Sequence, residues 1–131
     1  MPVRAFPPIP KDLRPRLEDA RLDTLALLRA IDRALIAPHK LPRQELHQLH
    51  ELDADCAEAL WALDQPAGSL DFRAMVRDTL ASLDQLAAAR ELIRARIPSA
   101  AQTRVTTLEN TIRAKLARRE AYNDVPRPHI R

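Results

Sequence analysis

Prolines divide this sequence into segments in which apolar residues recur at alternating intervals of four and three, the spacing of one face of an α-helix. The segment after Phe72 shows the pattern most fully, with Val76, Thr79, Leu83, Leu86, Arg90, Ile93 and Ile97 at these intervals. One glycine in 131 residues, few aromatic residues and an excess of leucine, alanine and arginine favour helices over strands. We therefore predict an all-α protein of one domain.

Turn and capping signals predict four helices, at about residues 12–37, 42–64, 70–97 and 100–122. Pro38 and Pro42 bound the first turn, and Pro42 suits the first position of a helix. Ser69 is placed to cap the third helix, and Ser99 with Gln102 matches a capping box at the start of the fourth. The second and fourth helices carry apolar stripes of their own, at Leu46, Leu49, Leu52, Cys56, Leu60 and Leu63, and at Ala101, Val105, Leu108, Ile112 and Leu116.

Short turns between helices of this length predict an antiparallel up-down-up-down four-helix bundle over residues 12–123. The alternative is a pair of helical hairpins that complete their core by dimerising. Extended proline-rich arms are expected on both sides of the bundle, at residues 1–11 and 124–131. An internal similarity between LDTLALLRAIDRA and LDQLAAARELIRA, 61 residues apart, fits a duplicated hairpin or chance in a chain of this composition.

The basic residues suggest an uneven charge distribution beneath a net charge of only +3. In an up-down bundle the first and third helices run parallel, so two arginine pairs meet at one end. Eight cations are expected there: Arg29, Arg33, Lys40, Arg43, Arg90, Arg94, Arg96 and Arg104. At the opposite end, the carboxylates of the first three helices are expected to neutralise the basic end of the fourth.

Arg90 is the one charged residue on the apolar seam of the third helix, and two interpretations apply to it. Its stem could cover apolar surface while its guanidinium reaches water or a phosphate beyond the last core layer. Alternatively, it could complement the carbonyl end of the helix dipole or pair with Glu45 of the second helix.

Catalytic patterns were sought and are sparse, so we expect no enzyme, cofactor, metal or small-molecule substrate. His47 and His50 lie three apart, but the carboxylates of a bundle metal site are missing, and Glu51 is as well placed for an ion pair with His47. Cys56 lies on an apolar stripe and is expected to be a buried structural thiol.

A spacing of arginine, six residues and histidine, at Arg43 and His50, is similar to that of helical-bundle ribonucleases of the HEPN type. Those enzymes usually carry a polar residue beside the arginine, and here that residue is Gln44. The resemblance covers two residues and implies ribonuclease activity as one alternative function.

Neither a membrane span nor a secretion signal is recognisable, so a cytoplasmic location is expected. The aromatic residues are not interleaved with the basic cluster, and Trp61 is expected in the core. The sequence thus predicts a non-catalytic accessory subunit of a nucleoprotein complex that contacts the phosphate backbone of RNA or DNA without sequence specificity. The alternative is a protein-interaction or self-associating scaffold, which would use the heptad seams and the arms FPPIP and VPRPHIR.

Overall fold

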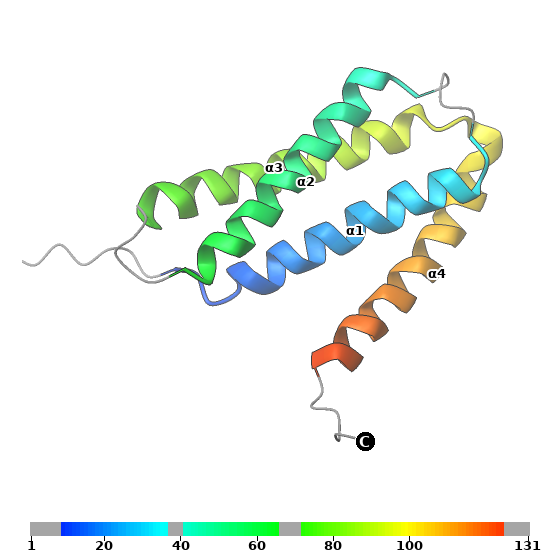
Figure 1. Cartoon of the computed structure of the whole chain (residues 1–131). Coiled ribbons are helices and arrows are strands. Elements are labelled where there is room, and N and C mark those ends of the chain that lie inside the picture. Colours follow the sequence, from blue (N-terminus) through cyan, green and yellow to red (C-terminus); the bar gives the residue numbers. More distant parts are fainter. Residues whose placement is uncertain (1–8, 37–40, 66–71, 125–131) are drawn as a thin grey trace, which may run out of the picture.

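The structure is a computed structural model, and it describes residues 9–36, 41–65 and 72–124. Four helices make up nearly all of this part of the chain, and no strand occurs in it, which confirms the all-α prediction (Figure 1). The helices are α1 (Leu13–Arg33), α2 (Arg43–Leu63), α3 (Phe72–Arg96) and α4 (Ser99–Asp124). The predicted arms, except for a few residues at their inner ends, lie outside the described residues, as does Ser69.

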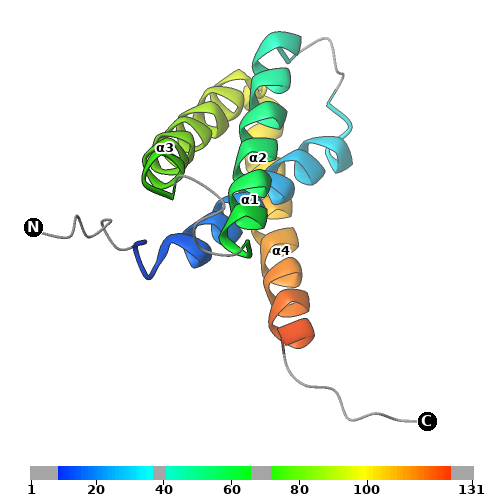
Figure 2. The ribbon, with the colours of Figure 1, turned by 60° about the vertical axis from the view of Figure 1, so that its left-hand side comes forward.

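Helix α1 is the centre of the packing, because it contacts each of the other three helices. Helix α2 packs on α3, whereas α4 packs mainly on α1. After the tight turn at Pro98, α4 diverges from α3 and passes along the other side of α1 (Figures 1 and 2). The packing is consistent with a bundle, with α4 as its most loosely enclosed member.

The apolar seam predicted on α3 faces the core, where Leu83, Leu86, Ile93 and Ile97 are buried. The stripe of α4 is less enclosed. Val105 and Ile112 are buried, but the other three apolar residues of that stripe remain half-buried, because α4 has one main neighbour instead of two. The single core therefore lies mostly between α1, α2 and α3.

Helix α1 ends at Arg33, earlier than the predicted boundary, and the reason is the backbone at Leu35. Leu35 has a φ of 55°, and its N–H donates to the carbonyl of Asp32 at 3.1 Å. A left-handed residue after a helix redirects the chain, and a side chain with a Cβ makes this conformation costly by about 1–2 kcal/mol. The chain returns to the core at Leu41, which is buried.

Three local predictions need correction. Ser99 is the first residue of α4 and not its cap, and Gln102 donates to the carbonyl of Ile97 at 3.1 Å, so this side chain satisfies the end of α3 instead of forming a capping box. Pro42 precedes α2 as its cap residue, one position earlier than expected. Trp61 is not a core residue, because 60% of it is exposed.

Cys56 is fully buried, as predicted, and burial together with the nearby carboxylates of Asp53 and Asp55 raises the pKa of its thiol to about 11. At pH 8 only about one thiol in a thousand is then ionised, and the thiolate is the reactive form. We predict that a thiol reagent labels Cys56 in the native protein only as fast as the protein unfolds, and at once in denaturant.

The same pKa shift makes stability depend on pH. Because the folded pKa lies above that of the unfolded thiol, the stabilisation from this group is complete below about pH 9 and is lost as the pH rises towards 11. Urea unfolding of the wild type and of Cys56→Ala between pH 8 and pH 11 measures this loss, and the free energy of unfolding should fall more in the wild type. An equal fall in both proteins would contradict the prediction.

Candidate nucleic-acid interface at the basic end

The last turns of α1 and α3 and the first turns of α2 and α4 lie at one end of the molecule, which we call the basic end (Figure 1). An ion pair between Arg96 of α3 and Glu45 of α2, at 3.3 Å, joins two of these helices. Arg29, Arg33, Arg43 and Arg104 come from the other turns of this end. Arg94 lies in the last turn of α3 as well, whereas Arg90 lies nearly two turns before the end of that helix and contacts the middle of α1. Lys40 lies outside the described residues.

Arg90 does not reach solvent beyond the core, and its side chain is only 13% exposed. Its guanidinium donates to the carbonyl of Ala20 at 3.2 Å and to the hydroxyl of Thr24 at 3.3 Å. Both acceptors belong to α1, and the Thr24 hydroxyl in turn donates to the Ala20 carbonyl. The interpretation of Arg90 as a rim residue is therefore wrong, and so is its pairing with Glu45, which contacts Arg96 instead.

The carboxylate of Asp23 links Arg90 to α4. It lies 3.9 Å from the Arg90 guanidinium and also accepts a hydrogen bond from Arg113, whose second partner is Asp19. The hydrogen bond to Asp23, opposed in part by burial and aided by the charges of both carboxylates, raises the pKa of Arg113 above its usual value. This chain of charges connects α3, α1 and α4.

Arg94 is likewise occupied within the molecule. Its guanidinium forms a two-pronged pair with Glu109 of α4, with one contact of 2.7 Å, and its Nε lies 3.2 Å from Glu91. Glu109 is 6% exposed, and the sequence analysis did not single it out. The spacing of Glu109 in the sequence could have predicted its burial. Glu109 follows Val105 by four residues and precedes Ile112 by three, which places it on the buried face of α4.

The structure thus separates the candidate cations into two groups. Arg90, Arg94 and Arg96 are held by acceptors within the fold. The other four described candidates are exposed, and they make no hydrogen bond or ion pair with any residue the structure describes: Arg29, Arg33, Arg43 and Arg104. We call these four residues the free arginines.

At the far end of the molecule the expected neutralisation is only partial: Arg113 of α4 contacts Asp19 and Asp23, whereas the exposed cations Lys115, Arg118 and Arg119 contact no carboxylate of the described residues. Arg14 pairs with Asp64, and Arg21 contacts Asp53 at 3.2 Å, so the start of α1 faces the end of α2. Such exposed pairs contribute little to stability, about 0–1 kcal/mol each.

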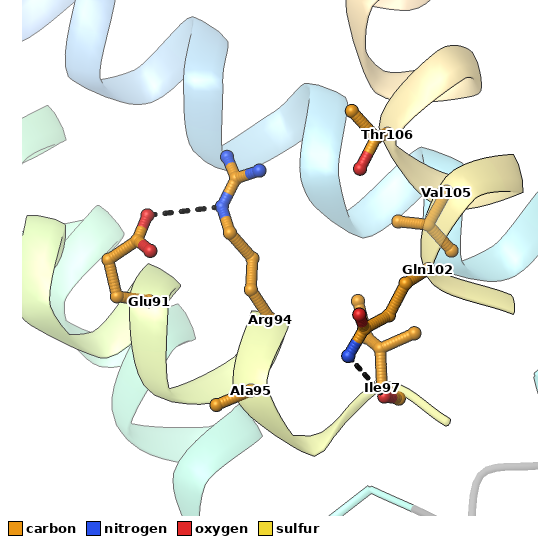
Figure 3. Close-up of a pocket in the computed structure, with 7 residues that line it drawn as sticks. All are labelled: Glu91, Arg94, Ala95, Ile97, Gln102, Val105 and Thr106. Atoms are coloured by element: carbon orange, nitrogen blue, oxygen red, sulfur yellow. Dashed lines mark hydrogen bonds and ion pairs between the residues drawn. The ribbon is translucent and has the colours of Figure 1, made fainter. Parts of the chain in front are cut away.

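A hollow of about 280 Å³ opens where α3 and α4 diverge, close to the basic end (Figure 3). Its lining residues are Glu91, Arg94, Ala95, Ile97, Gln102, Val105 and Thr106. Figure 3 shows the Arg94 side chain beside Glu91 and the Gln102 amide directed to the Ile97 carbonyl. Arg94 and Glu91 form an ion pair here, but the buried Nε of Arg94 has no hydrogen-bond partner among the described residues.

The residues considered for catalysis lie on the exposed surface of α2. His47 contacts Glu51 at 2.8 Å, and both are well exposed, which fits the ion pair considered in the sequence analysis. Arg43 and His50 are also exposed. Within residues 9–36, 41–65 and 72–124, no group of three or more His, Cys, Asp or Glu side chains is arranged to hold a metal ion. No helix in these ranges combines the length and apolarity needed to cross a membrane.

Comparison with known proteins adds no relative to this picture: no family model, no curated protein and no solved structure matches the chain.

The arrangement around Arg90 generates a stability prediction. Arg90→Ala removes two hydrogen bonds to α1 and leaves the Thr24 region less well packed, so we expect a loss of about 2–4 kcal/mol in the free energy of unfolding. Arg90→Lys should lower the free energy of unfolding less, because the lysine ammonium can still donate some of the hydrogen bonds that the guanidinium makes. Urea unfolding gives both values. The matched control is Arg104→Ala, which should change stability by no more than about 0.5 kcal/mol. A similar effect of Arg90→Ala and Arg104→Ala would contradict this assignment.

Proposed function

We propose that this protein is a non-catalytic helical accessory subunit that contacts the phosphate backbone of nucleic acid through the free arginines, without sequence specificity. The observation that supports the proposal is the set of four exposed arginines at the basic end, which have no hydrogen-bond or ion-pair partner among the described residues. The far end mixes paired arginines, such as Arg14 and Arg113, with exposed cations such as Arg16 and Arg119 that no described carboxylate contacts.

The chemistry of these side chains fits a phosphate partner. A guanidinium is always charged, is weakly hydrated and donates two parallel hydrogen bonds to phosphate oxygens. Contacts of this kind position a protein on nucleic acid but do not read its sequence. The proposal therefore uses four of the eight residues expected from the sequence, and it assigns Arg90, Arg94 and Arg96 to holding the helices in place.

The proposal also includes the finer arrangement and setting of the molecule. In this proposal the helices form an antiparallel up-down-up-down bundle, which brings the ends of the first and third helices together. The proposed location of the protein is the cytoplasm. It further includes a protein partner or a second copy, since an accessory subunit works within a complex.

Binding of a fluorescent 20-base-pair duplex, measured by anisotropy at several salt concentrations, tests the proposal. Four phosphate contacts predict a slope of log K against log salt of roughly −3.6, so affinity should fall about 100-fold between 50 and 200 mM salt. Replacing all four free arginines by glutamine should remove the binding, and each single replacement should reduce the slope by about one. Duplexes of unrelated sequence should bind equally.

A charge-matched variant serves as the control. Lys11, Arg16, Lys115 and Arg119 are exposed cations near the start of α1 and the end of α4, so replacing them by glutamine removes the same total charge from elsewhere. We expect this variant to keep most of the binding and the slope. Equal loss of binding in both quadruple variants, with circular dichroism unchanged, would overturn the proposal.

A further inference from the structure

An exposed aromatic side chain, Trp61, lies far from the basic end. Trp61 is on the last turn of α2, and 60% of it is exposed. Glu58 and Asp64 lie three residues before and after it, which places both carboxylates beside the indole on the helix surface. Asp55 lies about one further turn away. We call Trp61, Asp55, Glu58 and Asp64 the acidic tryptophan patch.

The charge of this patch is largely uncompensated. Glu58 and Asp55 are exposed, and neither forms an ion pair with another residue in the described part of the chain. Among the described residues, Asp64 pairs with Arg14. A large exposed indole surrounded by carboxylates is suited to a cationic partner, because guanidinium groups stack on indole faces and pair with carboxylates at the same time.

The free arginines of the same chain cannot reach this patch. Trp61 follows Arg43 by 18 residues on one helix, a distance of about 27 Å along the axis. Arg14 pairs with Asp64, so the start of α1 is beside the patch, and Arg33 lies about 28 Å further along α1. The two complementary surfaces are therefore at opposite ends of one molecule.

We propose that the acidic tryptophan patch of one copy docks on the basic end of a second copy, so that the protein associates head to tail. Charge complementarity selects this occupant, since one chain carries both an anionic patch with an exposed indole and a cluster of unpaired guanidinium groups. An interface between two different surfaces leaves a free surface of each kind on every dimer, so further copies can add. Phosphate binding at the basic end then competes with association.

The test is the solution mass of the full chain, measured by sedimentation velocity over a range of protein and salt concentrations. The wild type should show an average mass that rises with protein concentration and falls with salt. Trp61→Ala and Glu58→Arg should each weaken association about tenfold or more, as removal of a central interface residue does. A wild type that stays monomeric at low salt and high concentration would overturn the proposal.

A mixing experiment tests the head-to-tail geometry. Glu58→Arg disables the acidic tryptophan patch but keeps the basic end, whereas Arg33→Glu disables the basic end but keeps the patch. Each variant alone should be mainly monomeric, and the equimolar mixture should stop at the mass of a dimer. Failure of the mixture to form a dimer, although the wild type associates, would overturn the geometry.

Matched controls separate surface effects from unfolding. Asp84→Arg makes the same kind of charge change at an exposed residue of α3, and Leu92→Ala truncates a side chain that is 47% exposed on the same helix. Both should associate like the wild type, and circular dichroism should show every variant folded. Loss of association in these controls, or its survival in Trp61→Ala and Glu58→Arg, would assign the interface to another surface and overturn the proposal.

Head-to-tail association and nucleic-acid binding can be tested separately. Glu58→Arg should bind the duplex at least as well as the wild type, because its basic end is intact. A protein that associates but does not bind duplex would support the head-to-tail interface alone, and a monomer that binds duplex would overturn the interface and leave the proposed function standing.

Discussion

The arrangement of this molecule depends on the partly buried guanidinium of Arg90. It sits on the apolar seam of α3 and donates to a carbonyl and a hydroxyl of α1. A guanidinium largely removed from water must find acceptors of suitable geometry, and Arg90 finds them where α3 meets α1, at Ala20 and Thr24. The side chain therefore fixes the register of the two helices in a way that interchangeable leucine contacts cannot. The same group approaches Asp23, through which the position of α4 is coupled to that of α3.

Helix α4 illustrates how charge compensates for limited apolar contact. Its apolar stripe is only partly buried, because α1 is its main neighbour. Two arginine and carboxylate pairs attach it to the other helices, Arg113 to α1 and Glu109 to α3. Glu109 is nearly buried, so loss of its partner Arg94 would leave an expensive charge.

The sequence was sufficient to predict four helices, the buried seam of α3 and the buried thiol of Cys56, because apolar periodicity and proline positions carry this information directly. It was not sufficient for Arg90, Trp61 or Glu109. A charged residue on a seam is compatible with a rim position or with internal hydrogen bonds, and only the packing of α1 decides between them. Trp61 lies on the exposed face of α2, which no local pattern reveals. The left-handed Leu35 has no signal at all, since glycine or asparagine is the usual residue in that conformation.

The central claim is that the fold divides its arginines into those occupied within the molecule and those left for a partner. Nuclear magnetic resonance of the arginine Nε–H groups, recorded while a short DNA duplex is added to dilute protein, tests this division directly. The account predicts that the signals of Arg29, Arg33, Arg43 and Arg104 shift together, while those of Arg90 and Arg94 stay in place. Movement of the Arg90 and Arg94 signals to the same extent, or shifts confined to arginines of the far end such as Arg14 and Arg21, would contradict it.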